Sequence, residues 1–98
     1  MNVKKVTVEN VNVPGHTSRV DAEKYSAMKD AILAVAPTQA PGLTAKEMLD
    51  SVLPLLPQNL WPDGVKAGWW QKTVQLDLEA KGLLRRCPDS APLRWFRV

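Results

Sequence analysis

Two residues with reactive side chains, His16 and Cys87, occur once each in this chain of 98 residues. His16 follows a Pro-Gly pair, and no serine, cysteine or carboxylate stands at a spacing from it that is typical of catalysis. Cys87 precedes a proline and lacks the surroundings of a reactive thiolate. Without carboxylates or a second chain, the pair cannot complete a four-ligand zinc site. We therefore expect no catalysis, no cofactor and no bound metal.

Seven polar or basic residues near the C-terminus are candidates for binding nucleic acid. Glutamine can pair with two atoms of adenine, and lysine can reach guanine or phosphate. Four arginines on phosphates would give a salt slope of about −3.6. The same residues also suit a solvated helix face and an ordinary charged hairpin, which need no partner. The candidates are Gln71, Lys72, Gln75, Arg85, Arg86, Arg94 and Arg97.

Four tryptophans raise the alternatives of core packing and stacking on a base. Trp69 and Trp70 lie in the apolar arc of an expected helix, so at least one belongs to the core. Trp61, in a proline-rich loop, and Trp95, in an expected hairpin, are less determined, with the core favoured. Base stacking needs an exposed ring beside basic groups, and only Trp95 has arginines close by in the sequence.

The net charge of +3 is unevenly distributed. Residues 1–20 carry a net +2, residues 21–56 carry −2, and residues 57–98 carry +3. A basic C-terminal part suits a polyanionic partner, although the excess is mild. With 45% hydrophobic residues, the composition is that of an ordinary globular protein, and the length allows one domain.

Nothing in the sequence directs export or membrane insertion. The N-terminal residues alternate between polar and apolar where a signal peptide needs an unbroken apolar stretch. The longest apolar run, 31–36, is far shorter than the roughly 18 residues of a membrane span. We expect a cytoplasmic protein with no membrane association. The small size also leaves little volume for a ligand cavity, so we expect no small-molecule substrate.

The first part of the chain predicts an arm and a helix. Val3, Val6 and Val8 alternate as in a short strand, and residues 10–20 are turn-rich, so 1–20 is expected to be a strand or extended arm on a domain of residues 21–98. Asp21 is a plausible N-cap for a helix that Pro37 ends.

The second helix has the clearest start signal. Thr44 and Glu47 form a capping box, and Leu43 and Met48 occupy the positions of a hydrophobic staple. Pro54 limits this helix to about ten residues, and a loop over 55–64 should follow.

The third helix should run from about Val65 to Lys81, with Gly82 ending it. Its apolar arc contains Asp77, which needs a partner such as Lys81 or an arginine. The opposite face contains Gln71, Lys72, Gln75 and Glu79. A β-hairpin should follow, with strands at 83–87 and 93–98 and a turn at 88–91. The expected core is Tyr25, Met28, Ile32, Leu49, Val52, Leu53, Trp70, Val74 and Leu78.

The run from Lys72 to Arg86, KTVQLDLEAKGLLRR, resembles the junction of a winged helix-turn-helix domain, where the third helix enters the wing. Nearly the whole chain resembles a family of small bacterial proteins of unknown function, through NVPGHTSRVDAEKY, WPDGVKAGWW, VQLDLEAKG and PLR. The resemblance implies an α+β, mostly helical winged-helix fold of three helices and a C-terminal hairpin, but no activity. In winged-helix proteins that bind DNA, the third helix commonly enters the major groove and the wing meets the backbone or minor groove.

Two functions follow as expectations. The first is a regulatory module that binds double-stranded DNA through the third-helix polar face and the hairpin arginines, which rests on analogy of fold. The alternative is a non-catalytic module that binds a protein partner. About ten residues separate the second and third helices, where a helix-turn-helix has three or four. A neutral or acidic third-helix surface would favour the protein partner.

Overall fold

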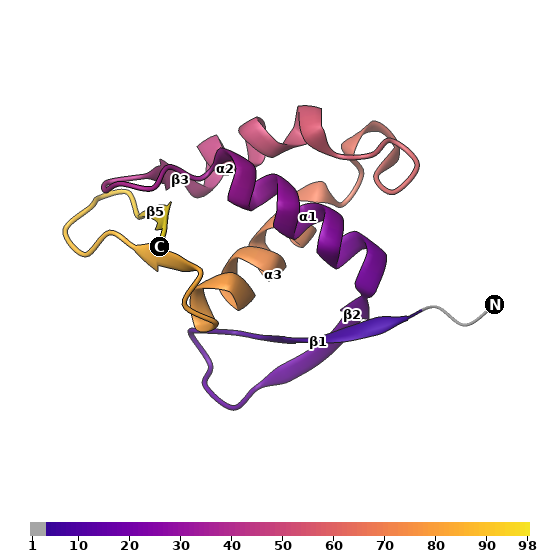
Figure 1. Ribbon diagram of the computed structural model, residues 1–98, viewed down its shortest axis with the longest axis horizontal. Helices are drawn as coiled ribbons and strands as arrows, with labels where there is room; N and C mark the ends of the chain where they lie inside the picture. The colour runs from indigo at the N-terminus through magenta and orange to yellow at the C-terminus, as the bar shows by residue number, and fades with distance from the viewer. Residues whose placement is uncertain (1–3) are drawn as a thin grey trace.

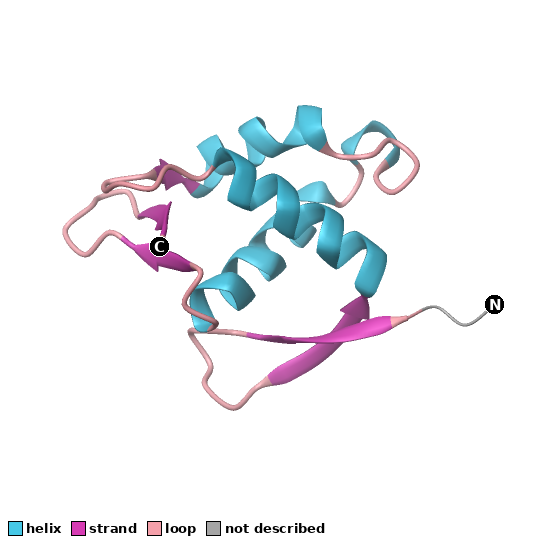
Figure 2. Cartoon of the chain, in the orientation of Figure 1, coloured by secondary structure: helices cyan, strands magenta, loops and turns pink. Residues whose placement is uncertain are grey.

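The protein is built from three helices and two small sheets, and the computed structural model describes residues 4–98 (Figure 1). The helices fill the middle and upper part of the view, and the two sheets lie below and to the left (Figure 2). The elements are, in order, β1 (Lys5–Glu9), β2 (Thr17–Asp21), α1 (Ala22–Val35), β3 (Leu43–Thr44), α2 (Ala45–Val52), η1 (Leu53–Leu55), η2 (Pro62–Gly64), α3 (Ala67–Ala80), β4 (Leu84–Arg86) and β5 (Arg94–Arg97).

Both helix N-caps that the sequence predicts are confirmed. The Asp21 side chain accepts a hydrogen bond from the Lys24 N–H at 3.0 Å, where α1 begins. At α2, the Thr44 hydroxyl accepts from the Glu47 N–H at 3.1 Å, and the Glu47 carboxylate accepts from the Thr44 N–H at 2.9 Å. This reciprocal pair is the predicted capping box. The helix has eight residues, because the chain continues from Val52 into the 3-10 turn η1.

We expect Thr44→Ala to lower the free energy of unfolding by about 1 kcal/mol, because the N-terminus of α2 loses a capping acceptor. Urea denaturation of the wild type and the variant measures this difference. Ser51→Ala removes an exposed hydroxyl from the last turn of the same helix and serves as the control. It should change the free energy by less than about 0.5 kcal/mol. Equal losses in the two variants would contradict the capping role.

The N-terminal segment forms a β-hairpin instead of a single strand with an extended arm. The strand expected around Val6 and Val8 is present as β1, while Val3 lies outside the described residues. Thr17–Asp21 form a second strand, β2, antiparallel to β1, with Val6 opposite Val20. The sequence did not predict β2, because this strand carries a single valine and its pairing depends on β1.

Asp77 of α3 ties this hairpin to the helices. Its side chain is fully buried, and the carboxylate accepts hydrogen bonds from the Glu9 N–H at 2.9 Å, from Lys81 Nζ at 2.5 Å and from the Tyr25 hydroxyl. Lys81 is one of the partners that the sequence predicts for a carboxylate in the apolar arc. Tyr25 and Glu9 come from distant parts of the chain. The network therefore joins β1, α1 and α3 through one side chain.

Tyr25 is the only tyrosine, and burial raises its pKa far above the ordinary value, with the hydrogen bond to Asp77 and the Asp77 charge acting in the same direction. The folded protein therefore holds the phenol proton more strongly than the unfolded chain does. This contribution to stability is complete below the unfolded pKa of about 10 and declines as the pH rises above it. In an alkaline titration, phenolate absorbance should appear only together with loss of the helical circular dichroism signal. Phenolate in a still-helical protein would contradict this.

The second sheet has the strand order β3-β5-β4, and both pairings are antiparallel. The β4–β5 hairpin confirms the expected C-terminal hairpin, although the connection spans 87–93 instead of 88–91. The two-residue strand β3 is an addition to the expected elements, with Leu43 opposite Trp95. Gly42 precedes it with φ +91°, and a Cβ at this position would overlap the Trp95 carbonyl oxygen. The backbones of β3 and β5 therefore approach each other at a site that only glycine fits.

The connection between α2 and α3 is more ordered than a loop. It contains η1 and η2, and Trp61 between them is 2% exposed. The ring of Trp61 packs edge-on against the ring of Trp70, with centroids 6.0 Å apart. The helix α3 begins at Ala67, two residues later than expected, and ends before Gly82, whose φ is +78°.

Seven of the nine residues expected in the core are buried, and two are not. Leu49 is partly buried, and Leu53 is 39% exposed. The expectation is wrong for Leu53 because it belongs to η1, where the chain has left the apolar stripe of α2. The buried residues are Tyr25, Met28, Ile32, Val52, Trp70, Val74 and Leu78. Trp61 and Trp95 are buried as well, as favoured for both.

Candidate binding surface

The two glutamines of α3 that were expected on a solvated or DNA-facing surface are buried. Gln71 is 4% exposed and Gln75 is 3% exposed. The Gln71 Nε2 donates a hydrogen bond to the Gln75 Oε1 one turn away. The expectation of exposure is wrong because the loop at Asn12, the start of α2 and the β4–β5 hairpin surround this side of α3. A helical wheel of α3 alone contains no information about these neighbours.

The surface of α3 that remains accessible is mainly apolar. Trp69, expected in the apolar arc, is 58% exposed, and Lys72 is also exposed. Thr73 and Leu76 are half-buried beside them. These four residues, which we call the α3 face, carry one cation and no acidic group. The Trp69 ring packs edge-on against the buried Trp70, with centroids 5.3 Å apart.

The β1–β2 hairpin borders one side of the α3 face. A small hollow of about 120 Å³ lies between them, and His16 and Ser18 of the hairpin line it together with Trp69 and Leu76. His16 itself is exposed. The hairpin therefore adds to the surface around Trp69 and also limits how closely a bulky partner can approach α3 from this side.

The four hairpin arginines divide between the two faces of the second sheet. Successive side chains of a strand point to opposite faces of the sheet, and paired residues share a face. Arg86 and Arg97 therefore lie on the same face as the buried Leu84, which faces the helices. Arg85 and Arg94 lie on the outer face. Among the described residues, the Arg85 side chain forms no hydrogen bond or ion pair, and it is exposed.

Three of these arginines are engaged by the protein itself. Arg86 Nη2 contacts Glu79 Oε1 at 3.1 Å, and its guanidinium lies over the Trp95 ring, 5.3 Å from the centroid. Arg94 Nη1 contacts Glu47 Oε1 at 3.0 Å, and Arg97 Nη1 donates to the Leu33 carbonyl at 3.2 Å. These contacts hold the hairpin against the helices.

Glu47 and Glu79 act as anchors that the sequence did not reveal. The backbone hydrogen bond from Thr44 lowers the pKa of Glu47, and the Arg94 charge acts in the same direction. Glu79, expected on the solvated face of α3, also accepts a hydrogen bond from Trp95 Nε1 at 2.9 Å. Trp95 is thus a buried, hydrogen-bonded ring and not an exposed platform for a base.

A groove runs between α3 and the β4–β5 hairpin. It has a volume of about 360 Å³, and we call it the α3–β5 groove. Its floor contains the paired glutamines, and Lys72 and Arg86 are the charged residues that line it; no acidic side chain does so within residues 4–98. The lining residues are Asn12, Ala45, Gly68, Gln71, Lys72, Gln75, Leu76, Arg86, Leu93 and Trp95.

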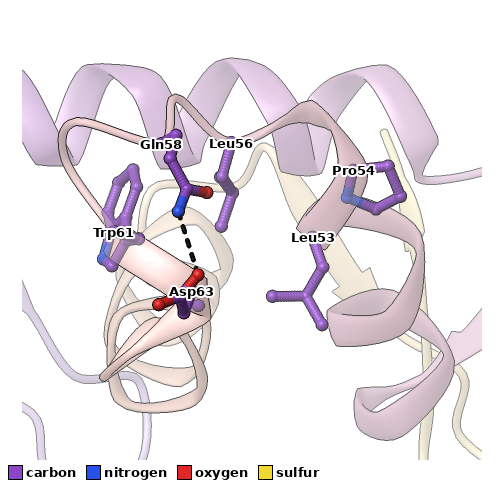
Figure 3. Close-up of a pocket in the computed structure, with 7 residues that line it drawn as sticks. Leu53, Pro54, Leu56, Gln58, Trp61 and Asp63 are labelled. Atoms are coloured by element: carbon purple, nitrogen blue, oxygen red, sulfur yellow. Dashed lines mark hydrogen bonds between the residues drawn. The ribbon is translucent and has the colours of Figure 1, made fainter.

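A second hollow of about 360 Å³ lies between η1 and η2 (Figure 3). Leu53 and Pro54 lie on one side, and Trp61 and Asp63 lie on the other. Gln58 donates a hydrogen bond to Asp63 at 3.2 Å, so the two polar side chains bond to each other. No cation lines this hollow in the described part of the chain, and we assign it no function.

No metal site or membrane-spanning helix emerges from residues 4–98. No group of three His, Cys, Asp or Glu side chains is arranged to hold a metal ion there. None of the helices in the same range is long and apolar enough to cross a membrane. Cys87 is a half-buried free thiol.

A family model matches most of the chain. No curated protein and no solved structure matches the chain. Residues 5–95 match DUF6958, described as a family of unknown function. The matched range includes α3, the β1–β2 hairpin and most of the second sheet. The chain therefore belongs to the DUF6958 family of unknown function.

Proposed function

We propose that this chain is a non-catalytic domain that binds a protein partner through the α3 face. The observation that carries the proposal is the composition of that face, in which an exposed tryptophan and a half-buried leucine lie beside a single cation. The cores of protein–protein interfaces are rich in aromatic residues and poor in charge. Surfaces that bind DNA are much more positively charged.

Trp69 has the properties of an interface anchor. Its side chain is 58% exposed, although the contact with Trp70 restricts its orientation. A large aromatic ring held in one orientation loses little conformational freedom when a partner covers it. Leu76 and Thr73 extend the surface by two further turns of α3. A partner that buries Trp69 would therefore gain most of its apolar contact at one point.

The arrangement of elements supports a winged-helix interpretation of the fold. From α1 onward the order is helix, strand, helix, helix, strand, strand, and the strand β3 lies beside the last strand, β5, which suits that topology. The connection between α2 and α3, with its two 3-10 turns, departs from the short turn of a helix-turn-helix. A fold of this kind supports several functions, so the assignment rests on the surface of α3.

Affinity capture with the immobilised wild-type chain tests the proposal, followed by titration of the captured protein after purification. We expect Trp69→Ser to weaken the affinity for that partner by at least about tenfold, as hot-spot tryptophans do. Leu55→Ser is the matched control, because Leu55 is 54% exposed in η1, away from the α3 face. Equal effects of the two substitutions, or no specific partner, would overturn the proposal.

Double-stranded DNA is the second candidate, and one observation favours it. Arg85 and Arg94 share the outer face of the second sheet, and Lys72 is exposed on α3. The buried glutamines and the ion pair between Arg94 and Glu47 leave Lys72 and Arg85 as the basic candidates without an intramolecular partner in the described chain. Two phosphate contacts would give a salt slope of only about −1.8.

A further inference from the structure

We infer that the α3–β5 groove binds an extended, acidic segment of the partner protein, an inference that rests on the proposed function. The first observation is the glutamine pair in its floor. Each glutamine is more than nine-tenths buried, and the Gln71 Nε2 bonds to the Gln75 Oε1. The remaining amide groups are the Gln71 carbonyl and the Gln75 NH₂. Within the described chain neither has a hydrogen-bond partner, and both keep contact with solvent in the groove.

This pair presents one acceptor and one donor side by side at the floor of the groove. An extended peptide carries the matching groups, a backbone N–H and a backbone carbonyl, along each edge. Both groups are open to solvent, so they are free to bond to a chain that enters the groove. The glutamine pair therefore fits recognition of a polar chain.

The charges that line the groove set the chemistry of the segment. Lys72 is exposed and unpaired among the described residues. Arg86 forms an ion pair with Glu79, with 3.1 Å between Nη2 and Oε1. With no acidic group in the lining, the groove attracts a carboxylate of the partner to Lys72. Leu93 is 44% exposed on the opposite wall, where it can contact an apolar side chain of the same segment.

The shape of the groove favours a single peptide chain over duplex DNA. The glutamine amides lie at its floor, between α3 and a hairpin that carries Leu93 and Trp95. The base edges of duplex DNA lie at the bottom of the DNA groove, so only protein side chains that project from the protein surface can reach them. Glutamines that are 3% and 4% exposed do not project in this way.

Selection from a phage-displayed library of random dodecapeptides tests the inference. We expect the enriched sequences to combine an acidic with an apolar residue. A synthetic peptide of the consensus sequence should bind the wild type, and Lys72→Glu should weaken that binding by at least about tenfold. Arg19→Glu, the matched control on the exposed outer face of the β1–β2 hairpin, should leave it unchanged.

The double variant Gln71→Leu with Gln75→Leu separates recognition from structure. It should fold as stably as the wild type, as judged by urea denaturation, because both members of the pair become apolar together. Its affinity for the peptide should fall by at least about tenfold, because the backbone groups of the peptide lose their hydrogen-bond partners. Full peptide affinity in this variant would overturn the inference. If the variant does not fold, two other measurements test the inference. Lys72→Glu should still weaken peptide binding, and the peptide should shift the NMR resonance of the Gln75 side-chain NH₂ group in the wild type.

Other outcomes also decide between the occupants. Enrichment of basic peptides, or of none, would overturn the groove assignment. A dimer in sedimentation that Lys72→Glu dissociates would identify a second copy of the chain as the occupant and overturn it as well. If the purified partner still requires Trp69 while no peptide requires the groove, the inference fails and the proposed function stands. If neither requirement is found, both fail.

Discussion

Asp77→Ala is expected to lower the free energy of unfolding by about 3 to 5 kcal/mol, because two donors lose their acceptor at a cost of about 1 to 3 kcal/mol each. The substitution removes the acceptor for three donors at once, and it leaves the Tyr25 hydroxyl in the core and the Glu9 N–H in a partly buried position. Lys81 can turn toward solvent, because its side chain is 37% exposed. Most of the loss should therefore come from the two donors that remain unpaired.

Urea denaturation of Asp77→Ala, with Asp50→Ala as the control, measures this effect. Asp50 is an exposed carboxylate on α2, and its removal should change the free energy by less than about 0.5 kcal/mol. Tyr25→Phe should have an intermediate effect, because it removes one hydrogen bond to a charged group, about 1.5 to 3 kcal/mol. A stability of Asp77→Ala close to that of Asp50→Ala would show that the carboxylate does not hold the hairpin to the helices.

Gly42→Ala is expected to lower the free energy of unfolding by about 3 kcal/mol. Two terms add at this position. An L-residue is strained at φ +91°, and its Cβ would overlap the Trp95 carbonyl, so β3 and β5 would have to separate. Trp95 is buried and hydrogen-bonded to Glu79, which limits how far β5 can move.

Gly15→Ala isolates the first term, the backbone strain. Gly15 has a similar φ of +87°, but a Cβ there would meet no atom within 4 Å. Only the backbone strain applies, and we expect a loss of about 1 to 2 kcal/mol. Parallel thermal and urea denaturation of the two variants gives the comparison. Equal losses would mean that the approach of Gly42 to β5 imposes no constraint on the fold.

Local signals made the helices predictable. The Asp21 cap, the Thr44 and Glu47 capping box, Pro37 and Gly82 each act within a few residues, so their outcome depends little on the rest of the chain. The two short strands β2 and β3 were not predictable in the same way. Their pairing partners lie elsewhere in the sequence, and neither has an alternating pattern of its own.

The candidate site was less predictable than the fold. The helix periodicity places Gln71, Lys72 and Gln75 on one face of α3. Only Lys72 is exposed, because the β4–β5 hairpin and the start of α2 cover one side of the helix. Trp69 belongs to the apolar arc and is nevertheless exposed. Which part of an amphipathic helix is covered depends on its neighbours, and this information is absent from the periodicity. The binding roles of the seven candidate residues stay predictions.

Titration of labelled duplex DNA at low salt tests most directly whether the α3 face recognises protein or nucleic acid. The wild type is compared with a Lys72→Ala and Arg85→Ala double variant, which removes the two exposed basic candidates without an intramolecular partner in residues 4–98. Our account predicts no DNA binding tighter than about 10⁻⁴ M for either protein. Tighter binding by the wild type that the double variant loses would contradict it and establish DNA as the partner.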